Sequence, residues 1–214
     1  MSTMPPINLL SPPALLIVDM QNTFCHPDGV FVKAGIQVPP STIAGAATQI
    51  NRLRAAFHAA NFPVIFMGYA FNEDYSNAGI LWDFPGGDQM KANKILVRGT
   101  WDAEIIDELK PDESKGEILL EKYRNSAFAA GTKLDEVLRS NGVKQIVVCG
   151  TATNVCVEST VREAAGMDWR CVTVGDACGA LTTEEHNASL KNLAWYGGVH
   201  DTAQIEEALK RIST

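Results

Sequence analysis

The sequence has few basic residues and no cluster of them. Its 214 residues include 18 Lys and Arg against 25 Asp and Glu, which gives a formal net charge of −7. Nucleic acids and anionic membranes are bound by clustered positive charge, so neither partner is expected. The longest apolar runs, such as residues 14–18, are also far too short to cross a bilayer.

Cysteine pairs and targeting signals are lacking as well. The five cysteines are an odd number and form no Cys-x-x-Cys pair, which favours reduced thiols over a disulfide framework. Residues 1–13 are polar, rich in Pro and free of Lys and Arg, so we read no secretory or transit leader there. We therefore expect a cytoplasmic protein, and one of its thiols is a candidate for chemistry.

Apolar runs bounded by turn residues alternate with segments of helical periodicity. Strands are expected at residues 14–18, 64–67, 118–120, 145–149 and 171–174, with a weaker sixth near Val199. Helices are expected at residues 41–61, 102–109, 134–140, 154–165, 184–195 and 204–212. Runs that are apolar throughout are typical of strands buried on both faces. The pattern predicts a three-layer α/β fold, with a mainly parallel sheet of about six strands between helices, as one domain over residues 1–214 with a short extension at residues 1–13.

Residues 72–91 are polar, glycine-rich and aromatic, and they show no clear period. Loops of this length inside a domain are usually lids or binding loops. The aromatic residues in or beside this stretch are therefore candidates for a pocket wall: Tyr69, Tyr75, Trp82 and Phe84. Plain packing beneath a lid explains them equally well.

An acid, a cation and a thiol follow three of the expected strands. Asp19 follows residues 14–18, Lys122 follows residues 118–121, and Cys156 begins the helix after residues 145–149. Ligands of open parallel sheets bind beyond the carboxyl ends of the strands, so these side chains should converge. A helix start favours a thiolate, Lys122 supplies an opposite charge, and Asp19 supplies a proton acceptor.

Each of these residues also has a purely structural interpretation. A buried cysteine is more often a small apolar side chain than a nucleophile. Asp19 could cap a turn, and Lys122 could be the solvated end of a strand. Gln21 and Asn22 either hold a substrate carbonyl or amide, or stabilise the turn after the first strand. The shared placement of the acid, the cation and the thiol favours chemistry.

Four segments resemble, in order, the signature segments of the isochorismatase-like cysteine hydrolases: residues 15–22, 98–105, 121–128 and 150–160. The resemblance extends from residue 14 to about residue 208. It implies the Rossmann-like fold of that family and a catalytic triad of Asp19, Lys122 and Cys156. It also implies a cis peptide between Thr151 and Ala152, and an oxyanion hole formed by the backbone N–H groups of Ala152 and Cys156.

The residue at the nucleophile position separates activities in this family. Members that hydrolyse the vinyl ether of isochorismate typically have Gly there, whereas the amidohydrolases have Cys. Cys156 therefore indicates an amidohydrolase that cleaves a C–N bond of a small linear amide or ureide through a thioester. Residues 101–111 and 156–163 most resemble the ureidoacrylate and biuret hydrolases. A vinyl-ether hydrolase, or a non-catalytic binding module of the same fold, is the alternative.

The resemblance also gives expectations for substrate contacts, cofactors and assembly. Side chains near the strand ends are expected to contact the small-molecule substrate: Gln21, Asn22, Phe24, Trp82, Tyr123 and Tyr196. Biuret hydrolases carry Gln where this chain has Tyr196, which predicts a different or wider pocket. No cofactor and no metal are expected, because residues 68–76, which match the metal-binding stretch of the family's nicotinamidases, contain no His. A homodimer or homotetramer is expected, as is usual in the family.

Overall fold

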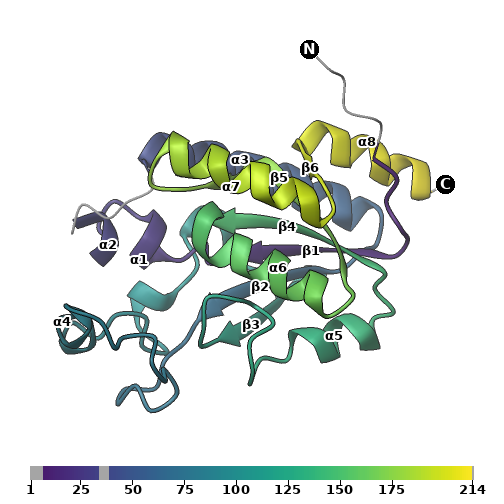
Figure 1. Ribbon diagram of the computed structural model, residues 1–214. Coiled ribbons are helices and arrows are strands. Elements are labelled where there is room, and N and C mark those ends of the chain that lie inside the picture. The colour runs from purple at the N-terminus through teal and green to yellow at the C-terminus, as the bar shows by residue number, and fades with distance from the viewer. Residues whose placement is uncertain (1–6, 34–38, 214) are drawn as a thin grey trace.

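A parallel β-sheet forms the centre of the computed structural model, which describes residues 7–33 and 39–213 (Figure 1). Within those residues the sheet has six strands in the order β3-β2-β1-β4-β5-β6, and every pairing is parallel. The strands are β1 (Pro13–Val18), β2 (Val64–Tyr69), β3 (Ile118–Lys122), β4 (Gln145–Thr151), β5 (Arg170–Gly179) and β6 (Val199–His200). The expected strands are confirmed, including the short one near Val199.

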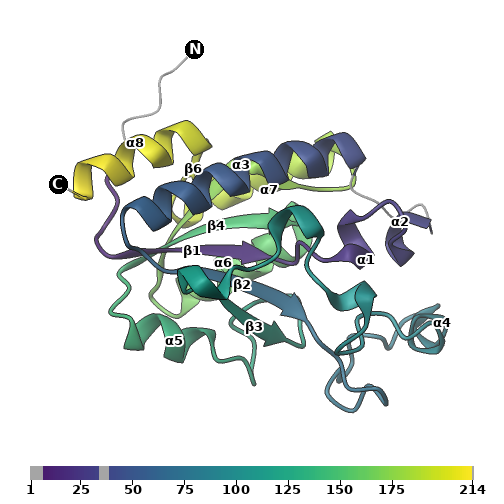
Figure 2. The same ribbon diagram turned by 180° about the vertical axis from the view of Figure 1, so that it is seen from behind.

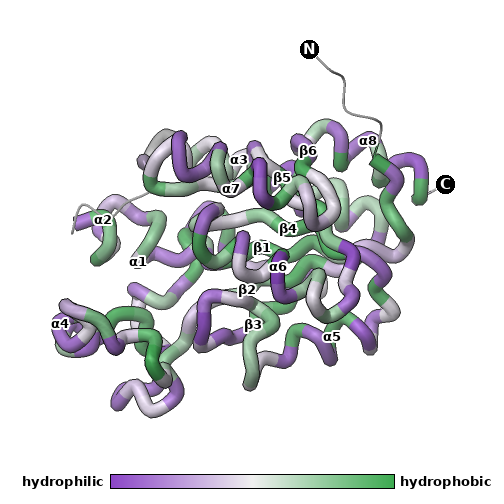
Figure 3. The backbone as a smooth tube through the Cα atoms, in the orientation of Figure 1, coloured by the Kyte–Doolittle hydropathy of each residue, from purple (hydrophilic) through white to green (hydrophobic). Residues whose placement is uncertain are grey.

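The central strands are buried along their whole length. Every residue of β1, β2 and β4 is buried, because helices cover both faces of the sheet. The apolar, green segments of Figure 3 accordingly gather on these strands. β3 lies at the edge of the sheet, where Leu119 is 53% exposed. Lys122 is nonetheless fully buried at the end of this edge strand.

Helices form a layer on each face of the sheet. The helices of the described residues, of which α3 and α5 to α8 form these layers, are α1 (Asn22–Cys25), α2 (Val30–Lys33), α3 (Pro40–Ala59), α4 (Gly87–Ala92), α5 (Leu134–Ser140), α6 (Glu158–Gly166), α7 (Thr183–Leu193) and α8 (Thr202–Ile212). α3 and α8 pack on one face, and α5, α6 and α7 cover the other (Figures 1 and 2). The three-layer α/β fold is thus confirmed. No helix within residues 7–33 and 39–213 is long and apolar enough to cross a membrane.

Several helix boundaries differ from the expected ones. α3 begins at Pro40 with Pro39 before it, since proline suits the first turn of a helix. The helix expected at residues 154–165 starts with a π-helical turn, Thr153–Val157, and α6 follows it. A 3₁₀ turn, Ala194–Tyr196, ends the helix expected at residues 184–195. α1, α2 and α4 were not expected, because helices of four to six residues carry no readable period.

The prediction of a helix at residues 102–109 is wrong. Two separate 3₁₀ turns, Trp101–Ala103 and Asp107–Leu109, replace it. Between them the chain is extended, and Ile105 forms an antiparallel bridge with Gln21. The next N–H group, that of Ile106, donates to the Met20 carbonyl at 2.9 Å. Backbone groups that pair with the segment after β1 cannot also form the hydrogen bonds of a helix.

The expected N-terminal extension is described only in part, because residues 1–6 lie outside the described residues. Ile7 and Leu9 are buried, and the Leu10 N–H donates to Gln145 Oε1 at 2.8 Å. The part of the extension next to β1 therefore packs against the sheet rather than extending into solvent.

Residues 72–91 form packed turns and part of α4. The Tyr75 hydroxyl donates to the Ile95 carbonyl at 2.7 Å, and Arg124 Nη1 donates to the Asn77 carbonyl at 3.0 Å. Trp82 is 6% exposed. This segment follows β2, and these contacts hold it beyond the carboxyl ends of β2 and β3.

The direction in which the sheet grows reverses between β1 and β4. The chain adds β2 and β3 on one side of β1, and β5 and β6 on the other side of β4. The connections that leave these two neighbouring strands therefore lie on opposite faces, which leaves a crevice at their carboxyl ends. Ligands of such sheets bind in this crevice, so the residues after Val18 and Thr151 are the ones to inspect.

Candidate active site

An acid, a cation and a thiol meet at the carboxyl ends of the central strands. Asp19 follows β1 directly, Lys122 is the last residue of β3, and Cys156 lies in the π-helical turn after β4. Lys122 Nζ lies 2.9 Å from Asp19 Oδ2. Cys156 is near enough for the charge of Asp19 to raise the pKa of its thiol. The structure therefore brings together the three residues that the sequence singled out.

Asp19 leaves its strand in a left-handed backbone conformation, with φ at 53°. Asp adopts this region more readily than most other residues. Its N–H still pairs with the sheet, since it donates to the Met67 carbonyl at 2.9 Å. The side chain is only 1% exposed. Burial raises the pKa of the Asp19 carboxyl above its ordinary value, and the nearby charge of Lys122 opposes that rise.

The ammonium group of Lys122 has its partners inside the protein. It donates to the carbonyls of Arg124 and Asn125, each at 2.9 Å, and it lies 2.9 Å from the Asp19 carboxylate. It also lies 3.5 Å from the centre of the Tyr69 ring, a cation–π contact. Two of its three N–H donors go to these carbonyls, and the ammonium is paired in charge with Asp19. Lys122 therefore fixes the position of Asp19 and of the turn after β3.

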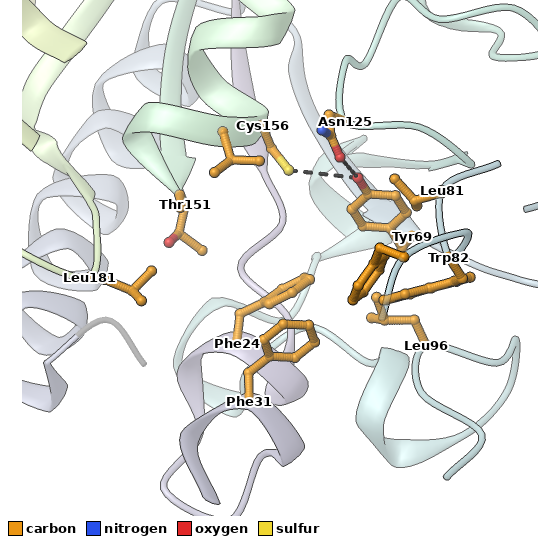
Figure 4. Close-up of a pocket in the computed structure, with 13 residues that line it drawn as sticks. Phe24, Phe31, Tyr69, Leu81, Trp82, Leu96, Asn125, Thr151, Cys156 and Leu181 are labelled. Carbon is orange, nitrogen blue, oxygen red and sulfur yellow. Dashed lines mark hydrogen bonds between the residues drawn. The ribbon is translucent and has the colours of Figure 1, made fainter. Parts of the chain in front are cut away.

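Cys156 carries the thiol that points toward the cavity in Figure 4. Its Sγ lies 3.7 Å from the Tyr69 hydroxyl oxygen. Burial raises the pKa of the thiol to about 12, Asp19 acts in the same direction, and Lys122 opposes both. The expectation that the helix start favours a thiolate is therefore wrong for the resting site. Burial outweighs the helix start, and the thiol is neutral.

A hydroxyl and an amide complete the polar surroundings of the thiol. Tyr69 Oη donates its hydrogen bond to Asn125 Oδ1 at 2.7 Å (Figure 4). The Tyr69 oxygen is also in hydrogen-bond contact with Cys156 Sγ, and either atom can be the donor. The sequence reasoning missed Asn125. Asn125 lies three residues after Lys122, near the carboxyl end of β3. Since ligands of parallel sheets bind near such strand ends, its position was a usable signal.

The turn that carries Cys156 is fixed by one buried threonine. Thr160 Oγ1 donates to the Cys156 carbonyl at 2.6 Å and accepts from the Ala127 N–H at 3.0 Å. The threonine thus joins the nucleophile's turn to the segment after β3. Isolated π-helical turns are frequent at functional sites. The peptide bond between Thr151 and Ala152, just before this turn, is cis.

A cavity of about 260 Å³ opens in front of Cys156 (Figure 4). Most of its wall is aromatic or aliphatic: Phe24, Phe31, Tyr69, Leu81, Trp82, Phe84, Leu96, Val155 and Leu181. Asn125, Thr151, Ala152 and Cys156 complete the lining. Tyr69 ends β2, Thr151 ends β4, and Ala152 and Cys156 follow β4, as the crevice predicts.

Some of the expected wall residues line the cavity, and the lining also contains residues that were not expected. Phe24 and Trp82 line it, and so do Tyr69 and Phe84. Tyr75 does not, because its ring packs at 5.5 Å on Phe71 outside the lining. No sequence signal marks the remaining apolar residues of the lining, since single apolar side chains in turns are indistinguishable from core residues.

Gln21 and Asn22 serve the fold and do not line the cavity. Gln21 Nε2 donates to the carbonyls of Tyr69 and Ala103, and its Oε1 accepts from the Tyr69 N–H. Asn22 Nδ2 donates to the Trp101 carbonyl at 2.8 Å. These contacts fit the structural alternative, in which both side chains stabilise the turn after β1, and a substrate contact stays a prediction.

Tyr123 and Tyr196 also lie outside the cavity lining, contrary to expectation. Tyr123 follows Lys122, and neighbouring residues of an extended chain point to opposite faces. Its hydroxyl donates to Glu121 Oε2 at 3.2 Å. The Arg162 guanidinium stacks on the Tyr196 ring, 4.8 Å from the ring centre, at the end of α7. Neither ring lines the cavity in front of Cys156, and a substrate contact by either stays a prediction.

Metal ligands are not clustered in the part of the chain that the structure describes. Across residues 7–33 and 39–213, no three His, Cys, Asp or Glu side chains are placed to hold a metal ion. At the cavity, Asp19 is already paired with the positive charge of Lys122. That the activity needs no metal stays a prediction.

The chain is similar to known proteins along most of its length. Residues 13–204 match the isochorismatase domain family. The chain is 36% identical over 201 residues to the ureidoacrylate amidohydrolase RutB of Acinetobacter baylyi, which covers 88% of this chain and 80% of that protein. A cysteine hydrolase from Pseudomonas syringae pv. phaseolicola has a TM-score of 0.83 at 30% identity, covering 99% of both chains. The N-carbamoylsarcosine amidase of Thermoplasma acidophilum has a TM-score of 0.66 at 25% identity, covering 89% of this chain and 96% of that one.

Proposed function

The chain belongs to the isochorismatase family of hydrolases, and from this premise we propose that it is a cysteine amidohydrolase acting on a small linear amide or ureide. One observation carries the proposal: a cysteine faces an open cavity beside a buried carboxylate and a buried ammonium. Two relatives support the type of bond, since one is named an amidohydrolase and the other an amidase.

In the first half of the proposed reaction, Cys156 is the nucleophile. Asp19 takes the thiol proton, Sγ bonds to the amide carbonyl carbon, and the carbonyl oxygen becomes an oxyanion. Because burial raises the pKa of the thiol, the nucleophile needs Asp19 as its proton acceptor. Asp19 then gives the proton to the leaving nitrogen, and the C–N bond breaks to leave a thioester.

In the second half, water attacks the thioester. Asp19 removes a proton from the water, and the proton returns to the thiolate of Cys156 as the acid product leaves. Lys122 keeps Asp19 in place and offsets the cost of its buried charge. The backbone N–H groups of Ala152 and Cys156 would hold the oxyanion, and one such donor contributes roughly 3–4 kcal/mol.

The proposed function is tested by ammonia release from a panel of amides and ureides. Cys156→Ala should abolish turnover. Cys171→Ala is the matched control, because Cys171 is buried in β5 and does not line the cavity. Equal activity of the two variants would refute the proposal, as would the absence of ammonia release from every amide and ureide by the unmodified enzyme.

A further inference from the structure

We propose that the cavity selects neutral primary amides whose acyl group ends in an apolar substituent, and that it rejects acyl groups that end in a carboxylate. The inference rests on the proposed amidohydrolase function and specifies its substrate class. It follows from the wall of the cavity, from the charges near it and from the position of Asp19.

The wall is apolar on every side except at the thiol. Phe24 and Phe31 form a pair of rings, 5.2 Å apart, that faces Trp82 and Leu96 across the cavity in Figure 4. Leu181 lines it beside Thr151. Burial of an apolar group against such a wall is favourable in proportion to the area that leaves water. A substrate that ends in a branched aliphatic or aromatic group is therefore expected to bind well against this wall.

No described residue of the cavity lining is a Lys, Arg or His. Lys122 lies nearby, but it is fully buried, it donates to the carbonyls of Arg124 and Asn125, and its charge is paired with that of Asp19. Arg124 Nη1 already donates to two backbone carbonyls. A carboxylate against the apolar wall away from Tyr69 would lose its hydration and contact no cation of the lining, which is unfavourable.

The polar groups at the cavity suffice for one amide group. The Asn125 Oδ1 accepts from Tyr69, and its Nδ2 has no hydrogen-bond partner within the described residues. That amide N–H can donate to a substrate oxygen beside Cys156. Along the aromatic part of the wall, Trp82 Nε1 also has no hydrogen-bond partner within the described residues, but this N–H group is itself buried. One end of the substrate is therefore polar, and the other end is apolar.

The position of Asp19 determines whether the apolar substituent belongs to the leaving group or to the acyl group of the substrate. Asp19 and Lys122 are fully buried and do not line the cavity. The leaving nitrogen must approach Asp19 to receive its proton, so it enters the part of the site with the least room. A small leaving group, ammonia, fits there, and the apolar substituent must belong to the acyl group that stays on Cys156.

A matched pair of amides tests this inference. Isocaproamide and succinamate have the same chain length, and an isopropyl group in the first stands where the second has a carboxylate. We expect kcat/KM to be about 100-fold higher for isocaproamide, as apolar pockets discriminate by factors of this order. An equal or higher kcat/KM for succinamate would overturn the proposal.

Two variants locate the origin of the preference. Leu181→Arg places a cation at the cavity wall and should lower the isocaproamide-to-succinamate ratio by about tenfold, through a charge-assisted contact with the carboxylate. Leu119→Arg makes the same change at an exposed position on β3, outside the lining, and should leave the ratio unchanged. Equal ratios for the two variants would contradict a preference set by the cavity.

Binding to Cys156→Ala separates this inference from the proposed function. Ligand-observed NMR should show binding of isocaproamide and none of succinamate at the same concentration. If isocaproamide binds but no amide is hydrolysed by the unmodified enzyme, the proposed function fails and the selectivity stands. If succinamate is hydrolysed faster in a Cys156-dependent reaction, the selectivity fails and the function stands.

Discussion

Lys122 Nζ and the Asp19 carboxylate form an ion pair, 2.9 Å apart, whose two side chains are withdrawn from solvent. Lys122 lies at the end of the edge strand β3, and Asp19 follows the end of β1. The strand β2 lies between β3 and β1. A buried pair of this kind is expensive to break, because the remaining charge loses its partner. The pair thus couples the stability of the fold to the position of the carboxylate beside Cys156.

Removing one member of this pair should reduce both stability and activity. Lys122→Met leaves Asp19 buried without a counter-charge, and the free energy of unfolding should fall by about 3–5 kcal/mol. Asp19→Asn should lower kcat/KM by about a thousandfold or more, since the proton acceptor is lost. Urea unfolding and ammonia release measure the two effects.

A double variant of Asp19 and Lys122 distinguishes the role of the ion pair in stability from its role in catalysis. Asp19→Asn with Lys122→Met removes both charges, so it should regain part of the stability that Lys122→Met loses, while activity stays absent. Its rate loss should be smaller than the product of the two single losses, because the residues act as one unit. A strictly multiplicative rate loss would argue against a shared role.

The reactivity of Cys156 should rise with pH throughout the alkaline range. Its pKa is raised to about 12, so the thiolate fraction grows about tenfold for each pH unit below that value. The rate of alkylation by iodoacetamide, followed by peptide mass, should show no plateau between pH 6 and the pH at which the fold is lost. A plateau near neutral pH would show a preformed thiolate and contradict the neutral resting thiol.

The hydroxyl of Tyr69 should contribute to the rate. Tyr69→Phe keeps the ring over Lys122 but removes the group 3.7 Å from Sγ and the bond to Asn125. We expect kcat to fall by about five- to tenfold, the equivalent of one neutral hydrogen bond of about 1 kcal/mol. Tyr75→Phe is the control: it removes the bond to the Ile95 carbonyl outside the cavity and should lower stability without lowering kcat. Equal kcat values for the two variants would refute a role for Tyr69.

Thr160 should act as a positioning residue. Thr160→Val leaves the Cys156 carbonyl and the Ala127 N–H without their shared partner, at a cost of about 1–3 kcal/mol in stability. Because the turn that carries the nucleophile would shift, kcat should fall more than KM rises. Thr160→Ser keeps the hydroxyl and should restore kcat. If Thr160→Val lost stability alone, with kcat unchanged, the positioning role would be wrong.

The sequence predicts the strands of the sheet well because buried strands leave a clear pattern of apolar residues. Strands that are covered on both faces need apolar residues at every position, and β1, β2 and β4 show such runs. Asp19, Lys122 and Cys156 could be singled out for a related reason. Each is a chemically distinctive residue at a strand end or helix start, where the fold itself forms a crevice.

The features that the sequence does not predict depend on contacts between distant segments. Residues 102–109 have helical spacing, yet Ile105 pairs with Gln21 because the segment after β1 needs a partner. The same contact commits Gln21 to the fold and removes it from the cavity. The neutral state of Cys156 depends on the burial of its thiol and the nearby charge of Asp19, and no motif encodes either.

The most direct test of the account is the mass of Cys156 during turnover. The amide with the highest kcat/KM is mixed with the enzyme, quenched in acid at successive times, and the protein is digested and mapped. The account predicts that the peptide containing Cys156 gains the mass of the substrate less ammonia, and that the other four cysteines stay unmodified. The same mass on another residue, or turnover with Cys156 unmodified at every quench time, would contradict it.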